Sequence, residues 1–240
     1  VGTIAAVAGI FLWLRACAAA PLPLDTSRLV FGAPVRLSGV VHVHTNLSDG
    51  RGDPEEVIAQ ARAAGVDFLV VTDHNRVDPE RFPERAGDPT LIVGSEVSTE
   101  AGHILAIGIR PPAFRFSGTL REVLDDIRFL GGCAFAAHPT SPRGETRFTR
   151  AEEPGNFGLE IVNGDTAWRE ASPFSLALAA WTYPANPSFA LRGTLGQFSS
   201  ERALWDQMLQ RRFVPALAGT DAHGRIPISR TRSLPLPSYE

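Results

Sequence analysis

The sequence contains no lysine, and all 23 of its basic residues are arginine. This absence excludes catalysis through a lysine Schiff base. It also excludes the P-loop, whose phosphate-binding motif requires a lysine. The formal net charge is −3, so the chain as a whole lacks the basic surface that extended nucleic-acid binding requires.

Cysteine is nearly absent as well. Only Cys17 and Cys133 occur, and two distant cysteines form neither a disulfide framework nor a cysteine-rich zinc site. Cys133 begins the apolar run 133–137, which predicts that it lies in a buried strand. The length of 240 residues predicts one large domain or two small ones.

The N-terminal segment differs in kind from the rest. Residues 1–14 are almost wholly apolar, and Arg15 follows them. The stretch is short for a membrane span, but with further residues upstream it fits a span or the apolar part of a signal peptide. We therefore expect residues 1–20 to be a truncated signal peptide or membrane anchor, and the protein to be exported or membrane-anchored, in a bacterial periplasm or cell envelope. A buried helix and lipidation of Cys17 are the alternatives.

The remaining chain divides into a linker and a folded domain. Residues 21–36 have prolines and little periodicity, which predicts a linker. Residues 37–240 form the predicted domain, and its proline-rich end after Gly224 indicates that the C-terminus is also cut short. Within the domain, short apolar runs alternate with amphipathic stretches, which predicts an α/β fold with parallel strands. The predicted strands are 40–43, 68–71, 91–93, 104–109, 133–137, 159–162 and 214–218, and the predicted helices are 54–64, 119–130, 171–181 and 200–211.

Polar side chains gather at the ends of these predicted strands. All six histidines lie at or beside a strand end, with three acidic residues among them. Because sites assemble at the carboxyl ends of parallel strands, we expect these side chains to converge. Imidazole and carboxylate ligands without thiolate suit zinc, manganese or iron. The residues are His42, His44, Asp49, His74, Glu96, His103, His138, Asp221 and His223.

The motifs around these residues resemble those of the PHP (polymerase and histidinol phosphatase) superfamily. The opening motif is SGVVHVHTNLSDG at 38–50, and the second is VVTDHN at 70–75. Four more follow in the order that the family has: GSEV at 94–97, GHIL at 102–105, AHP at 137–139 and GTDAH at 219–223. A single H-x-H motif is weak, whereas the ordered set, from Leu37 to Gly224, is specific.

The resemblance implies a distorted seven-stranded β/α barrel that holds three divalent metal ions. Carried over position by position, it implies that His42, His44 and Asp221 bind the first metal. Glu96 would bridge the first and second metals, and His103 and His138 would complete the second. Asp49, His74 and His223 would hold the third metal.

Three further residues are candidates for supporting roles. Asp73 is expected to orient a metal ligand. Arg143, in the loop after His138, is a candidate phosphate clamp, with a solvated loop arginine as the alternative. Asn163 is a candidate for orienting the substrate. The long segment 165–212 is expected either to form a cap that shapes specificity or only to pack against the barrel.

Such a centre predicts a metal-dependent hydrolase that uses a metal-bridged hydroxide as nucleophile. The first hypothesis is a phosphoesterase that acts on a small molecule, with nucleotides or oligonucleotides as further substrates. The second is an amide, carbamate or ester hydrolase, because Asn75 and the short Glu96-to-His103 connection resemble the carbaryl-hydrolase-like branch. The third is a non-catalytic, metal-stabilised binding domain.

Overall fold

The computed structural model describes residues 2–19, 37–82, 89–227 and 233–235. The chain divides into two compact units. Among the described residues, the helical unit comprises 2–19 and 167–197, and the main unit comprises 37–166 and 198–235. The predicted linker, 21–36, lies outside the described residues.

The helical unit begins with α1 (Gly2–Ala18) and contains α5 (Pro173–Thr182) and α6 (Pro187–Arg192). Asn186 joins two of these helices. Its amide nitrogen donates to the carbonyl oxygens of Ala16 and Ala19, at 3.0 and 3.1 Å, and its oxygen caps α6 by accepting from Phe189 N. None of the described helices has the length and apolar character that crossing a membrane requires. The role of residues 1–20 as a signal peptide or anchor stays a prediction.

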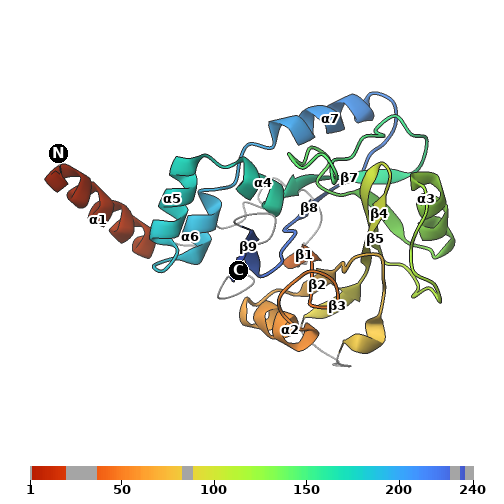
Figure 1. Ribbon diagram of the computed structural model, residues 1–240, viewed down its shortest axis with the longest axis horizontal. Coiled ribbons are helices and arrows are strands. Elements are labelled where there is room, and N and C mark those ends of the chain that lie inside the picture. The colour runs from red at the N-terminus through yellow and green to blue at the C-terminus, as the bar shows by residue number, and fades with distance from the viewer. Residues whose placement is uncertain (1, 20–36, 83–88, 228–232, 236–240) are drawn as a thin grey trace, which may run out of the picture. The chain divides into compact units, whose positions relative to one another are not determined.

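A three-stranded parallel sheet opens the main unit. It consists of β1 (Gly39–Val43), β2 (Phe68–Val71) and β3 (Thr90–Val93). The helix α2 (Pro54–Ala63) lies beside it (Figure 1) and buries Val57 and Ile58 in a shared core. The sequence predicted both ends of α2, since the Asp53 side chain accepts from Glu56 N and Gly65 takes the left-handed conformation that ends many helices.

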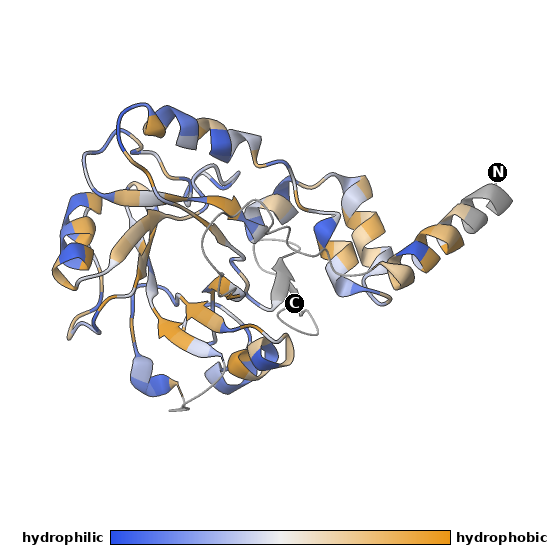
Figure 2. Cartoon of the chain, turned by 180° about the vertical axis from the view of Figure 1, so that it is seen from behind, coloured by the Kyte–Doolittle hydropathy of each residue, from blue (hydrophilic) through white to orange (hydrophobic). Residues whose placement is uncertain are grey.

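A five-stranded sheet completes the main unit, in the order β4 (Ser95–Thr99), β5 (Gly102–Ile107), β6 (Cys133–Ala136), β7 (Phe157–Asn163) and β8 (Ala216–Gly219). The pairs β4–β5 and β5–β6 are antiparallel, whereas β6–β7 and β7–β8 are parallel. The helices α3 (Leu120–Phe129) and α7 (Ser199–Leu209) lie beside this sheet (Figure 1) and contribute to its core. Figure 2 shows that the strands are mainly hydrophobic and the outer loops mainly hydrophilic.

The smaller elements are η1 (Pro79–Arg81), α4 (Gly164–Glu170), β9 (Arg225–Pro227) and β10 (Ser233–Pro235). The last two form an antiparallel pair. α4 follows β7 directly. The predicted cap segment 165–212 contains four helices, α4 to α7, of which two were predicted, and it is divided between the two units. Whether it acts as a cap stays a prediction.

The two sheets meet through irregular backbone contacts. Gly94 separates β3 from β4, and a Cβ at this position would overlap the carbonyl oxygen of Ala106. An isolated bridge joins His74 to Glu96, and another joins Val43 to Ala222. His44 N also donates to Ala222 O at 2.9 Å. The ends of β1, β2, β4 and β8 are thereby brought together.

The structure corrects several expectations. The described strands form three sheets, of three, five and two strands, instead of one closed seven-stranded barrel, and β5 runs antiparallel to both its neighbours. The sequence analysis missed β4, because polar Ser95, Glu96 and Ser98 interrupt its apolar pattern. Cys133 is exposed rather than buried. α7 begins at Ser199, one residue before the predicted start, and its N-cap is Phe198 in a left-handed conformation without a side-chain cap.

The Asp53 cap gives a stability prediction. Asp53→Ala removes the acceptor for Glu56 N and is expected to lower the free energy of unfolding by about 1 kcal/mol. Urea unfolding followed by circular dichroism measures the change. Gln60→Ala, in the same helix, is the matched control and should have little effect, because glutamine and alanine differ little in helix propensity. Equal stability of wild type and Asp53→Ala would contradict the cap.

Candidate metal centre

The first two ligand candidates lie at the end of β1. His42 and His44 are fully buried, and their Nε2 atoms lie 3.2 and 3.1 Å from Glu96 Oε2. On a regular strand, residues two apart share a face. The strand is nevertheless irregular, because its pairing with β2 shifts at His42, which has a φ of 68°.

Glu96, at the start of β4, stands at the middle of the cluster. Its side chain is 2% exposed. While Oε2 faces His42 and His44, Oε1 lies 2.7 Å from both His103 Nδ1 and His138 Nε2. One carboxylate therefore contacts imidazoles from two sides, which is the arrangement that a ligand between two metals requires.

Asp221 joins the cluster from the segment after β8. Its Oδ1 lies 3.3 Å from His42 Nε2 and 3.4 Å from His44 Nε2. The side chain is 7% exposed. Asp221 and Glu96 thus approach the same two imidazoles, as expected for ligands of a common ion.

Asp49 lies near three histidines in a more solvent-exposed part of the cluster. Its Oδ1 lies 3.3 Å from His223 Nε2 and 3.6 Å from His74 Nε2 and His44 Nδ1. The Asp49 side chain is 43% exposed. This side of the cluster is therefore open to solvent, whereas the side formed by His42 and Glu96 is closed.

Three sets of these residues have donor atoms within 4.8 Å of one another: His42, His44, Glu96 and Asp221; His44, Asp49 and His74; and His74, Glu96 and His103. The first set contains the predicted ligands of the first metal together with Glu96. The other two divide the ligands differently from the prediction, because His44 replaces His223 in one and His74 replaces His138 in the other. All nine predicted ligands nevertheless lie in one cluster, since His138 contacts Glu96 and His223 contacts Asp49.

The hydrogen bonding of the buried ring nitrogens indicates whether this cluster suits a metal. His42 Nε2, His74 Nδ1 and His138 Nδ1 are buried and have no hydrogen-bond partner among the residues that the structure describes. Buried polar atoms without partners are rare because each is costly. For the first two, divalent ions bound between the imidazoles and carboxylates would supply the missing partner, and this set of donors suits zinc, manganese or iron.

The backbone is strained where it carries these ligands. Of the five described residues other than glycine with a positive φ, four belong to or adjoin the cluster: His42 (68°), Asn75 (56°), His138 (28°) and Asp221 (54°). Such conformations cost on the order of 1–3 kcal/mol each and persist where the surroundings enforce them. Strain concentrated on ligand positions is typical of a functional site.

Electrostatics couple the acidic and basic ligands. Burial alone would raise the pKa of Glu96, but the nearby His42 and hydrogen bonds from His103 and His138 hold it well below its usual range. Burial alone would lower the pKa of His44, yet hydrogen bonds to Asp221 and Glu96 raise it to about 9. Without metal, the two carboxylates therefore favour the protonated form of His44, so a metal has to displace that proton in order to bind there.

Asp73 supports the loop after β1 and belongs to none of the three sets. Its carboxylate accepts from Thr45 N and Oγ1, at 2.8 and 2.7 Å, and from Ser48 Oγ at 2.6 Å. Ser48 Oγ in turn lies 3.5 Å from His44 Nδ1. Ser48 thus lies between Asp73 and His44, and the orienting role of Asp73 stays a prediction.

The other two supporting candidates lie in different surroundings. Arg143 is exposed, and its Nε lies 3.5 Å from Glu145 Oε1, as in the alternative of a solvated loop arginine; its role as a phosphate clamp stays a prediction. Asn163 is buried and donates to Glu160 Oε2 at 2.9 Å and to Asp221 Oδ2 at 3.4 Å. It therefore contacts the protein's own carboxylates, and its role toward substrate stays a prediction.

Sequence reasoning missed Glu160. This residue is fully buried on β7, and its Oε1 lies 2.8 Å from His42 Nδ1. A charged residue between Leu159 and Ile161, in an otherwise apolar strand, was the available signal, because a buried charge requires partners.

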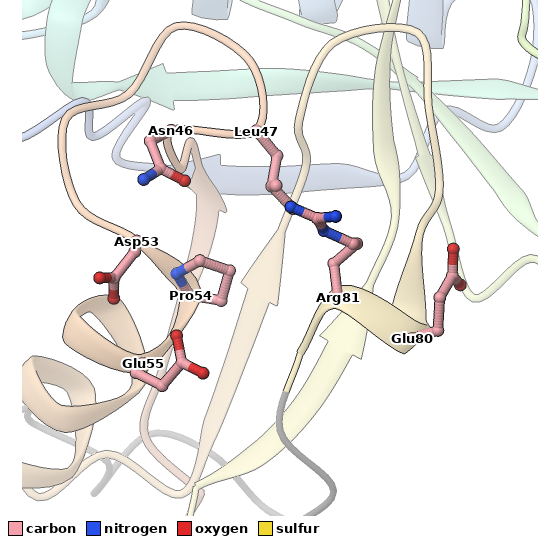
Figure 3. Close-up of a pocket in the computed structure, with 7 residues that line it drawn as sticks. All are labelled: Asn46, Leu47, Asp53, Pro54, Glu55, Glu80 and Arg81. Carbon is pink, nitrogen blue, oxygen red and sulfur yellow. The ribbon is translucent and has the colours of Figure 1, made fainter.

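A separate cavity of about 410 Å³ lies beside the loop after β1 (Figure 3). None of the nine ligand candidates lines it. Three of its lining residues are acidic and one is basic, which does not favour a phosphate. Its lining consists of Asn46, Leu47, Asp53, Pro54, Glu55, Glu80 and Arg81.

Comparison with known families supports the resemblance of the motifs. Residues 41–151 match the model of the PHP domain. The matched region contains every ligand candidate from His42 to His138, whereas Asp221 and His223 lie beyond it. The carbaryl-hydrolase-like branch is not distinguished by this match and stays a prediction.

Individual relatives are distant. An uncharacterized protein of Methanocaldococcus jannaschii, MJ1587, is 25% identical over 138 residues, which is 51% of this chain and 80% of that protein. A protein of Bifidobacterium adolescentis, described as a predicted metal-dependent phosphoesterase, has a similar structure, with a TM-score of 0.53 and 16% identity. The similarity covers 85% of this chain and 94% of that one. At this identity the comparison shows a shared fold.

A third protein, a two-domain protein of Bacteroides vulgatus that contains a predicted PHP-like metal-dependent phosphoesterase, is 17% identical with a TM-score of 0.46. The similarity covers 78% of this chain and 52% of that one.

The raised pKa of His44 gives a pH prediction. A metal-binding imidazole must be neutral, so zinc has to displace a proton from His44 below about pH 9. The affinity for zinc is therefore expected to fall as the pH is lowered from about 9 to 6.5, by up to about tenfold per pH unit for each proton displaced. Competition with a chelator measures the dissociation constant, and calorimetry in two buffers counts the released protons. A constant affinity over this range, without proton release, would contradict the prediction.

Proposed function

We propose that this protein is a metal-dependent phosphoesterase with a PHP-type centre. The observation that carries the proposal is the convergence of all six imidazoles and three carboxylates on one partly buried cluster, around Glu96. The match of residues 41–151 to the PHP domain supports it. We further propose that the centre holds three divalent ions, of zinc, manganese or iron.

The ions, when bound, would lower the pKa of a water molecule and neutralise the charge that develops on phosphoryl oxygens. The chain's own residues would prepare that chemistry. Glu96 contacts imidazoles on both sides through its two oxygens and so fixes the spacing of two neighbouring positions. Asp73 holds the loop that carries His44 and Asp49.

Differences in exposure indicate the direction from which a substrate would approach. The side chains of His42, His44 and Glu96 are at most 2% exposed. Those of His74 and His223 are 25% and 19% exposed, and that of Asp49 is 43% exposed. A small phosphoester would therefore enter on the Asp49 side, while the closed side excludes water.

The side chain of Asn75, which suggested the carbaryl-hydrolase-like branch, bonds to Ser98 on β4. Its Oδ1 accepts from Ser98 N at 2.8 Å, and its Nδ2 donates to Ser98 Oγ at 3.4 Å. Aspartate could accept from the same nitrogen and from the Ser98 hydroxyl, so the contact with Ser98 is compatible with either residue. It thus gives no support to the carbaryl-hydrolase-like branch, and we place carbamate or amide hydrolysis second.

The test compares p-nitrophenyl phosphate with p-nitrophenyl N-methylcarbamate, using purified protein supplied in turn with zinc, manganese and ferrous iron. Metal-dependent release from the phosphate ester alone supports the proposal. Release from the carbamate alone would contradict it in favour of the second hypothesis. Tight metal binding with no hydrolysis of these esters, of nucleotides or of oligonucleotides would favour a binding domain.

Substitution of the central ligands gives a prediction for activity. His42→Ala and Asp221→Ala each remove a donor from the most buried set. We expect kcat/KM to fall by more than the roughly 100-fold that loss of an outer-sphere partner can cost. Far-ultraviolet circular dichroism should stay close to that of wild type.

The matched control is Asp125→Ala, on the exposed side of α3, which should retain wild-type activity. Full activity in either ligand variant would show that the site is assigned wrongly.

A further inference from the structure

Glu160 is a buried carboxylate with three hydrogen-bond donors around it. On β7, its Oε1 accepts from His42 Nδ1 at 2.8 Å. Its Oε2 accepts from the backbone nitrogen of His138 at 2.7 Å and from Asn163 Nδ2 at 2.9 Å. The side chain is fully buried, so these bonds are shielded from water and are correspondingly strong.

The bond to His42 determines which ring nitrogen is free. A carboxylate can only accept, so the proton of a neutral His42 ring stays on Nδ1. Nε2, which has no hydrogen-bond partner among the described residues, is then left without a proton. That nitrogen faces Glu96 and Asp221, at 3.2 and 3.3 Å, where the metal is proposed to bind.

The other two bonds reach two further ligands. His138 has a φ of 28°, and the bond from its backbone nitrogen to Glu160 helps to hold that strained conformation. Asn163 donates both to Glu160 and to Asp221 Oδ2. Glu160 therefore contacts the His42 ring and the His138 backbone directly, and it reaches the Asp221 carboxylate through the Asn163 amide.

The neighbouring strand leaves room for this carboxylate. At Gly219, on β8, an added Cβ would overlap Glu160 Oε1 and would come within 3.0 Å of His42 Cβ. The glycine is therefore required by close approach, which ties the position of Glu160 to the β7–β8 pairing.

We propose that Glu160 is a positioning residue that sets the His42 tautomer and holds three ligands in register for metal binding. The inference rests on the proposed metal centre. It predicts a requirement for a carboxylate specifically. Glutamine would offer one acceptor, for His42, but would turn an N–H group toward His138 N and Asn163 Nδ2, both of which are donors.

The test is the affinity for zinc, measured by competition with a chelator at one pH. Glu160→Gln is expected to bind zinc roughly 10–100-fold more weakly than wild type, as is typical when an outer-sphere partner is lost. Glu201→Gln is the matched control, since Glu201 is also buried but accepts from Thr140 instead of a ligand candidate. The control should bind zinc as wild type does, and thermal unfolding of each metal-free protein reports its stability separately.

Nuclear magnetic resonance of protein with ¹⁵N-labelled histidine gives a readout that needs no variant. In wild type with zinc, His42 Nδ1 is expected to carry a hydrogen-bonded proton. Wild-type affinity in Glu160→Gln, or an unprotonated Nδ1 in wild type, would overturn the role of Glu160 alone. A wild-type protein that binds no zinc, manganese or iron would overturn the metal centre and this inference together.

Discussion

The buried carboxylate of Glu96 is the constraint on which the main unit depends. A charge removed from water requires compensation, and here five imidazoles provide it: those of His42, His44, His74, His103 and His138. These rings come from segments spread from β1 to the end of β6. Compensation of one charge therefore brings distant parts of the chain together, and it does so where the two sheets meet.

The strain and the irregular strand contacts follow from that convergence. Regular strands would place successive side chains on opposite faces, whereas the left-handed residues His42, His138 and Asp221 redirect the chain at the ligand positions themselves. Two buried carboxylates outside the set of ligand candidates then fix the positions of these residues. Glu160 bonds to His42 and His138, and Asp73 holds the loop after β1. The side formed by His42 and Glu96 is closed to solvent, while Asp49 and His223 leave the other side open.

Local patterns allowed much of the fold and the cluster to be predicted. The strand at 68–71 and the start of α2 depend on adjacent residues: an apolar run predicts the strand, and Asp53 followed by Pro54 predicts the start of the helix. The meeting of nine ligand candidates followed from their places at strand ends. β4 was not predicted because polar residues interrupt its apolar pattern, and without β4 the hairpin that sets the antiparallel course of β5 could not be recognised. Glu160 was not predicted because its partners His42 and His138 are distant along the chain. Its place in an apolar strand was the available signal.

The most direct test of the central claim is a crystal structure of the protein grown with zinc and manganese, with anomalous diffraction recorded at each metal's absorption edge. The account predicts anomalous peaks within bonding distance of His42 Nε2, Glu96 and Asp221, with further peaks beside Asp49 and beside His103. A map without any peak in this cluster, from crystals supplied with excess metal, would contradict it.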